Sequence, residues 1–202
     1  MDRYDTPEFK PYVNALGQFS LAWNALQHNL CVLFSIVTLE RTPVAGDEFN
    51  DVPTHIWHAI KSDRSQREML CEAIKHSKLG KENQLAEHGK WLIDRVGELE
   101  NRRNDILHSA LIPIERSPGV KEVIPDVFFL NPKARNLQKT RNLLEEILSC
   151  CSNAILLADY AQMLTGVLLM LPRAQFSWPD RPLLQGRHPK ETPVSQNPIS
   201  NK

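Results

Sequence analysis

The stretch Tyr12–Leu39, YVNALGQFSLAWNALQHNLCVLFSIVTL, decides the fold class of this chain. It contains no proline, and Gly17 is its only glycine, so nothing in it stops a helix. From Leu30 onward it is apolar on nearly every side, which predicts a helix at the centre of a bundle. Apolar residues recur with the three-and-four spacing of one helix face: Leu16, Phe19, Trp23, Leu26, Leu30, Leu33 and Val37.

Two more long helices are predicted further along the chain. One runs from Gln84 to about Leu111 and is closed by Pro113. The other begins at Asn131-Pro132, is basic at first and then apolar, and runs to about Leu171, before Pro172. The apolar stripe of the first of these helices comprises Leu85, Leu92, Val96, Leu99, Ile106 and Leu107.

Shorter elements fill the interval between the first two long helices. Pro53 is predicted to open a short helix through about Ser62, with Ile56, Trp57 and Ile60 buried. The capping-box pattern Ser65-Gln66-Arg67-Glu68 predicts the start of a second short helix. Residues 78–83, which include Gly80, are predicted to form a turn.

The segment before the last helix has the composition of a β-hairpin. Two short runs, Leu111–Arg116 and Lys121–Phe129, are rich in β-branched and aromatic residues and flank Ser117-Pro118-Gly119. Prolines within the runs restrict them to edge pairing, so a two-stranded flap against the bundle is expected. The predicted fold class is therefore all-α: a helical bundle of three long and two short helices with a small β-hairpin before the last helix.

The chain is expected to form one helical domain, residues 1–171, followed by a proline-rich tail. The tail, residues 172–202, has little apolar periodicity and is predicted to be mobile, apart from a candidate anchor at Phe176 and Trp178. With 202 residues, 42% of them hydrophobic, the chain has enough material for one core.

Charge, cysteines and hydropathy bound the class of protein. Lys+Arg and Asp+Glu both number 24, so the net charge gives no argument for a nucleic-acid partner. The four cysteines have no metal-ligand spacing and are expected to be reduced, in a cytoplasmic protein. Residues 154–171 are nearly long enough to cross a bilayer, but Asp159, Gln162 and Thr165 interrupt them. A buried bundle or dimer helix is the preferred interpretation, with no membrane partner.

The residues Asn101–His108, at the end of the second long helix, concentrate the usable chemistry. His108 can exchange protons near neutral pH, and the planar fork of Arg103 matches phosphate oxygens. Asn104 shares a helix face with His108. Such a set suits phosphoryl transfer without a metal: the histidine moves the proton of an RNA 2′-hydroxyl or of the leaving 5′-oxygen, and the arginine stabilises the transition state. No metal site or cofactor is predicted.

Helix geometry does not by itself bring the arginine and the histidine together. Five residues separate Arg103 from His108, which on a regular helix is about 140° of rotation and about 7.5 Å of rise. A long arginine, a loosened last turn or a second chain packed across the helix would have to complete the site. The alternative interpretation is structural, since both cations interact well with the C-terminal end of a helix dipole.

The sequence Arg103-Asn104-Asp105-Ile106-Leu107-His108 resembles the R-x(4–6)-H motif of the HEPN superfamily, in the version with a polar residue after the arginine. Trp23-Asn24-Ala25-Leu26 and the segment around Trp57 also resemble small bacterial HEPN-like proteins; where these often have Glu, this chain has Gln27. The resemblance implies a helical bundle and a homodimer in which two motifs face one cleft.

The resemblance also implies a metal-independent endoribonuclease, of the kind found in toxin–antitoxin and other defence settings. Arg103 and His108 would be the catalytic pair, and Asn104 a polar helper. Other HEPN proteins lack activity and act as binding modules or antitoxin partners, so a non-catalytic interaction module is the alternative. A purely structural helical dimer is a third interpretation.

Weaker candidates for contacts with an RNA backbone lie elsewhere, and each has an ordinary alternative as a solvated or ion-paired side chain. Asp105 is expected to be a surface salt-bridge partner, for instance of Arg102. The candidate RNA-binding cations are Arg64, Arg67, Arg102, Lys133, Arg135 and Lys139.

Overall fold

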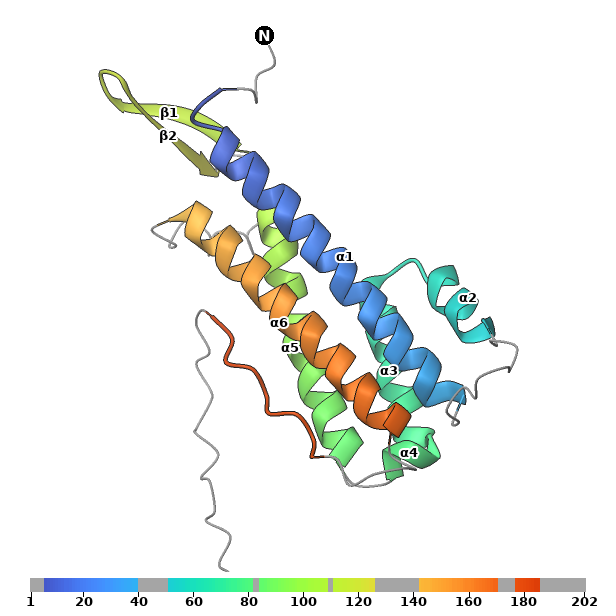
Figure 1. Cartoon of the computed structure of the whole chain (residues 1–202). Coiled ribbons are helices and arrows are strands. Elements are labelled where there is room, and N and C mark those ends of the chain that lie inside the picture. The colour runs from blue at the N-terminus through green and yellow to red at the C-terminus, as the bar shows by residue number, and fades with distance from the viewer. Residues whose placement is uncertain are drawn as a thin grey trace, which may run out of the picture.

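Three long helices form the body of the molecule in the computed structural model, which describes residues 6–39, 51–81, 84–108, 111–125, 142–170 and 177–185. They are α1 (Lys10–Leu39), α5 (Gln84–Leu107) and α6 (Leu143–Met170), and they lie along one another (Figure 1). The shorter helices α2 (Val52–Ala59) and α3 (Asp63–His76) cover one side of the lower half of this group. The predicted all-α bundle is confirmed.

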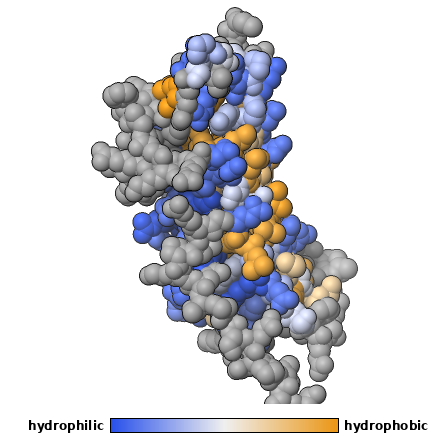
Figure 2. Space-filling view, turned by 90° about the vertical axis from the view of Figure 1, so that its left-hand side faces the viewer, coloured by the Kyte–Doolittle hydropathy of each residue, from blue (hydrophilic) through white to orange (hydrophobic). Residues whose placement is uncertain are grey.

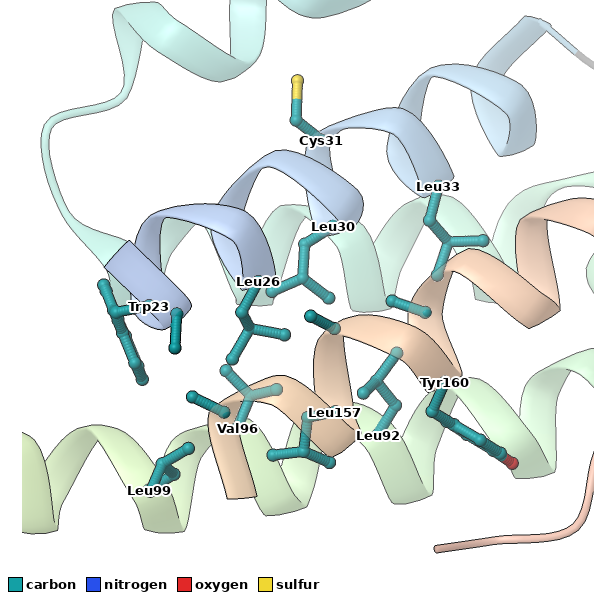
Figure 3. Close-up of a cluster of buried hydrophobic side chains, with 14 of the residues drawn as sticks. Trp23, Leu26, Leu30, Cys31, Leu33, Leu92, Val96, Leu99, Leu157 and Tyr160 are labelled. Atoms are coloured by element: carbon teal, nitrogen blue, oxygen red, sulfur yellow. The ribbon is translucent and has the colours of Figure 1, made fainter. Parts of the chain in front are cut away.

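The core lies where α1, α5 and α6 meet. Leucines of all three helices and Tyr160 of α6 are fully buried there (Figure 3). Each fully buried leucine contributes roughly 2 kcal/mol through removal of its surface from water. The central members, which the spacing of α1 and α5 predicted in part, are Leu26, Leu30, Leu33, Leu92, Val96, Leu157 and Tyr160.

The short helix α2 packs on α1 through one aromatic side chain. The Trp57 ring is buried, with its centroid 5.6 Å from that of Phe34. Ile56, which the sequence predicted to be buried, is exposed, and Ile60 follows the helix end and is partly exposed. An eight-residue helix that touches its neighbour along one line buries only one of two adjacent apolar residues, so the prediction for Ile56 was wrong.

The start of α3 also differs from the prediction. Its N-cap is Ser62, whose Oγ accepts a hydrogen bond from the Ser65 backbone N–H at 3.4 Å. The predicted capping box Ser65–Glu68 is therefore wrong, because these residues already lie inside the helix. The correct cap places Asp63 in the first turn, where a carboxylate interacts favourably with the helix dipole.

Two boundaries around α5 were also misplaced. Within the predicted turn at residues 78–83, Lys78–Lys81 form the one-turn helix α4. At the other end, α5 stops at Leu107 instead of about Leu111, because the chain turns at His108 and Leu111 begins a strand. Leu107, which was assigned to the apolar stripe, is exposed beside this turn.

The hairpin before the last helix is confirmed. Strand β1 (Leu111–Ser117) pairs antiparallel with β2 (Val120–Pro125), with Ile112 opposite Ile124. Gly119 at the turn has a φ of 83°, a conformation that glycine adopts without strain. The hairpin projects beyond the N-terminal end of α1 (Figure 1), where the Tyr12 hydroxyl donates to the Val123 carbonyl oxygen at 3.4 Å.

Helix α6 is, within the described ranges, the helix that is long and apolar enough to cross a membrane. Half of its most apolar window is buried inside the bundle, which is the pattern of a core helix. Its predicted start at Asn131 lies outside the described residues, as does the whole interval 126–141. The face in Figure 2 carries a band of hydrophobic residues between hydrophilic ones.

Part of the proline-rich C-terminal region packs along the surface of the bundle. Residues 177–185 form an extended segment beside α5 and α6 (Figure 1), and Trp178 and Leu184 pack against the core. The sequence anticipated an anchor at Trp178, but not a contact that continues to Gln185. Phe176 and residues 186–202 lie outside the described residues.

Candidate functional site

Arg103 lies on the last turns of α5, where that helix faces α1 and α3. Its guanidinium carbon is 4.9 Å from the centroid of the Trp23 ring on α1. Its Nη1 is 3.5 Å from Oδ2 of Asp63, at the start of α3. The side chain nevertheless remains 29% exposed. The sequence places a cation here, and the fold gives it an aromatic face and a carboxylate as neighbours.

Asp63 connects these neighbours to each other. The indole Nε1–H of Trp23 donates a hydrogen bond to Asp63 Oδ2 at 3.3 Å, the same oxygen that faces Arg103. Since Trp23 is buried, this bond satisfies a donor that burial would otherwise leave unpaired. Trp23 on α1 and Asp63 on α3 therefore hold the motif residue Arg103 in place. These three residues are called the arginine cluster below.

Asn104 links the two ends of the Arg103–His108 motif. Its side-chain Oδ1 accepts from Nη1 of Arg103 at 3.4 Å, and its backbone oxygen accepts from the His108 backbone N–H at 3.0 Å. The second bond continues the helical pattern one residue past the end of α5. The His108 side chain is exposed to solvent. The structure thus places the predicted residues at one end of α5, with Asn104 between the arginine and the histidine.

Arg102 points to a different neighbour. Its Nε donates to Glu146 Oε1 on α6 at 2.8 Å, and its Nη2 donates to the Ser149 hydroxyl at 3.3 Å. Glu146 is therefore a carboxylate partner of Arg102. An arginine that joins two helices in this way contributes to packing of α5 on α6, and these two bonds use two of its five N–H donors.

Arg67 is a buried structural residue. It pairs with Glu100 of α5, and only 9% of its side chain is exposed. Its guanidinium crosses α5 at Gly97, where a Cβ atom would lie 3.7 Å from Arg67 Nε. Arg64, one turn earlier, is fully exposed and bonds Glu68 at 2.8 Å. The sequence grouped these two arginines as RNA contacts, but the fold separates them into one buried and one solvated cation.

The remaining predicted cations, Lys133, Arg135 and Lys139, lie outside the described residues. In the part of the chain that the structure describes, no group of three or more His, Cys, Asp or Glu side chains has the arrangement of a metal site.

The cysteines are placed as packing residues. Cys31, Cys150 and Cys151 are buried, and Cys71 is partly buried. Burial raises the pKa of Cys150 to about 12, so its thiol stays protonated and unreactive at neutral pH.

A second polar cluster, which the sequence did not reveal, lies at the other end of α5. The His88 ring stacks on Trp178 with a centroid distance of 5.2 Å, and its Nδ1 forms a hydrogen bond with the buried Tyr160 hydroxyl. Burial lowers the pKa of His88, and the nearby Arg181 charge lowers it further. Burial likewise raises the pKa of Tyr160. Histidines scattered along a sequence carry no spacing signal for such a contact.

Comparisons of the chain with protein-family models, curated proteins and solved structures gave no match.

Proposed function

We propose that this chain is a metal-independent endoribonuclease of the HEPN type, acting as a cytoplasmic homodimer in a bacterial defence or toxin–antitoxin setting. The observation that carries the proposal is the end of α5: an exposed His108 follows a partly exposed Arg103, and the Asn104 side chain between them bonds to Arg103. A proton-transfer group, a fixed cation and a polar helper suit cleavage of a phosphodiester.

The proposed reaction is intramolecular transesterification of RNA. The 2′-oxygen attacks phosphorus while the bond to the 5′-oxygen breaks, which leaves a 2′,3′-cyclic phosphate and a 5′-hydroxyl end. His108 takes the 2′-hydroxyl proton or donates a proton to the leaving 5′-oxygen. Arg103 stabilises the charge on the phosphorane-like transition state through its planar donors.

Dimerisation would supply what one chain lacks. The His108 N–H still bonds Asn104 O as in a regular helix, in which about 140° of rotation separates His108 from Arg103. The motif of a second copy across the helix end would place a histidine beside each arginine. Exposed Leu107 on α5 and Leu148 on α6, at the motif end of the bundle, give apolar surface for a second copy.

The test is cleavage of a mixed RNA substrate by the purified chain in EDTA, with end-group analysis. His108→Ala should abolish cleavage and keep the fold, because the side chain is exposed. His58→Ala, which removes another exposed histidine on α2, is the matched control and should cleave like the parent. Cleavage that survives His108→Ala, or that chelation removes, contradicts the mechanism.

A non-catalytic interaction module is the second candidate, favoured by the contacts of the arginines. Arg103 faces Asp63, Arg102 pairs with Glu146, and Arg67 pairs with Glu100. Cations held by carboxylates offer a weaker attraction to RNA phosphates than free ones. Absence of cleavage over a broad RNA panel, together with unchanged RNA affinity in Arg103→Ala, would favour this candidate.

A further inference from the structure

The extended segment 177–185 contacts the bundle through every third residue. Trp178 stacks on His88, Arg181 lies 5.8 Å over the Trp91 ring, and Leu184 packs against the core. Leu183, between two of these contacts, is 91% exposed. A period of three is that of the polyproline II helix, which brings residues i, i+3 and i+6 to one side.

The sequence of the segment favours this extended form before any contact is made. Trp178 and Arg181 each directly precede a proline, Pro179 and Pro182. A residue before proline is restricted to extended backbone, and proline fixes its own φ. The two anchoring residues therefore have backbones that are already restricted, so they lose little backbone entropy on binding.

The bundle recognises the main chain of the segment as well as its side chains. The Asn153 side chain on α6 donates from Nδ2 to the Gln185 carbonyl oxygen and accepts at Oδ1 from the Gln185 N–H, both at 2.7 Å. The Ser149 hydroxyl donates to the same carbonyl at 3.3 Å. Asn153 is buried, so its amide would otherwise be a costly polar group in the wall of the bundle. Such two-way pairing with a backbone is independent of the side chain at that position.

An ion pair holds the middle of the segment on α5. Arg181 Nη2 lies 2.5 Å from Glu87 Oε1 on α5, while its guanidinium covers Trp91. Glu87 itself is largely exposed, so the ion pair contributes selectivity for a cation more than affinity. Helices α5 and α6 thus contact, in order along the segment, an aromatic ring, an arginine, an aliphatic side chain and a backbone amide.

We propose that this face of α5 and α6 is a binding site for extended, proline-containing peptide segments with an aromatic residue, an arginine and an aliphatic residue at successive third positions, and that residues 177–185 are its resident ligand. The residues that bind are Glu87, His88, Trp91, Ser149, Asn153 and Tyr160, called the peptide face below. The proposal does not depend on RNA cleavage.

The site is continuous with the candidate ribonuclease site. The Ser149 hydroxyl that donates to Gln185 O also accepts from Arg102 Nη2, and Arg102 is the neighbour of Arg103. Arg102 therefore connects the peptide face to the end of α5 that carries the motif.

The test is exchange of the resident segment for the same peptide added in solution. A fluorescein-labelled peptide with the sequence of residues 177–185, blocked at both ends, is titrated into the full chain and monitored by anisotropy. The full-length Trp178→Ala/Arg181→Ala variant should bind it at least tenfold more tightly than the parent, in which the tethered segment competes at high effective concentration. A peptide carrying the same two substitutions is the matched control and should bind at least tenfold more weakly.

A substitution in the peptide face locates the binding. Adding Asn153→Ala to the Trp178→Ala/Arg181→Ala variant should weaken peptide binding at least tenfold, because two hydrogen bonds to the ligand backbone are lost. Equal affinity of the parent and the segment variant, or no effect of Asn153→Ala, would overturn the proposal, as would a folded segment variant that leaves the peptide unbound at millimolar concentration.

If the segment variant does not fold, the proposal is tested by hydrogen exchange of the parent chain. Excess unlabelled peptide should displace the tethered segment and speed hydrogen exchange at the Gln185 amide, whose N–H is bonded to Asn153. An unchanged exchange rate at this amide would contradict the proposal.

Discussion

The guanidinium of Arg103 lies over the indole of Trp23, with the Arg103 carbon 4.9 Å from the ring centroid. This contact joins the most chemically suggestive part of the chain to its core, because Trp23 is buried among the central residues of α1. A cation on a tryptophan face is held in a narrow range of orientations, which is what a residue that meets a phosphate needs. The same contact also gives Arg103 a purely structural use.

The arginine cluster predicts a graded response to substitution at Trp23. Trp23→Phe keeps an aromatic face under Arg103 but removes the donor to Asp63, so it should cost about 1–2 kcal/mol of unfolding free energy. Trp23→Ala removes the ring from the core and should cost about 4 kcal/mol. Urea denaturation measures both. Asp63→Ala should cost less in the Trp23→Phe background than in the parent, and strict additivity would contradict the shared hydrogen bond.

Arg67 should behave as half of a buried ion pair and not as an RNA contact. Arg67→Met leaves the mostly buried Glu100 carboxylate without its partner and should destabilise the chain by about 3 kcal/mol. Arg67→Met/Glu100→Leu removes both charges and should recover most of that loss, as measured by urea denaturation. Arg64→Met, on the exposed side of α3, is the control and should leave the urea midpoint unchanged. Weaker RNA binding by Arg67→Met at unchanged stability would contradict this assignment.

Gly89 tests the packing of α3 on α5, and Gly17 in α1 is its control. A Cβ atom on Gly89 would lie 2.6 Å from Cδ1 of the buried Ile74, so Gly89→Ala should destabilise by about 1 kcal/mol despite its better helix propensity. Gly17, in α1, has open space, so Gly17→Ala should stabilise by about 1 kcal/mol. Thermal unfolding measures both changes.

Ile74 is the side chain that a methyl group at position 89 would meet, so shortening it tests the steric cause. Combining Gly89→Ala with Ile74→Val removes the Cδ1 atom that the new methyl group would meet. The double variant should therefore be more stable than the sum of the two single changes. Stabilisation by Gly89→Ala alone would show that Ile74 moves aside without cost.

Much of the fold could be predicted because its signals are local and long. The stretch Tyr12–Leu39 carries one helical period without a breaker, and the structure begins α1 at Lys10. The Pro118-Gly119 turn between two β-rich runs fixed the hairpin, since Gly119 takes the positive φ that the turn requires. Short elements were less accurate: Ser62, not Ser65, caps α3, because two equivalent serines in a row of polar residues leave the first turn ambiguous.

The surroundings of the site could not be predicted because they come from distant parts of the chain. Asp63 and Trp23 reach Arg103 only after α1 and α3 have packed on α5. Arg67 is buried against α5 at Gly97 and pairs there with Glu100, a contact without a sequence signature. The segment 177–185 lacks helical and strand periodicity, and its usable signal was the third-residue spacing of Trp178, Arg181 and Leu184 beside two prolines.

His88 makes the attachment of the C-terminal segment sensitive to pH. Its ring lies between Trp178 and Tyr160, with Arg181 and Glu87 as the charged neighbours. Burial, aided by Arg181, lowers its pKa below the ordinary 6.5, so the folded chain favours the neutral ring. The unfolded chain therefore binds a proton first as pH falls. The stabilising contribution is complete above pH 6.5 and is lost as pH falls from there through the lower pKa of the folded chain.

The pH dependence can be isolated with a variant that keeps the stacking. His88→Phe retains a ring between Trp178 and Tyr160 but cannot take up a proton, so it removes the titration while other histidines and carboxylates remain. Urea midpoints at pH 7.5 and pH 5.0 are compared for the parent and the variant. The parent should lose more stability than His88→Phe over this interval, because only the parent carries a ring that resists protonation when folded. Equal losses would show that the His88 ring accepts a proton without cost in the folded chain, and a larger loss in His88→Phe would reverse the assigned sign.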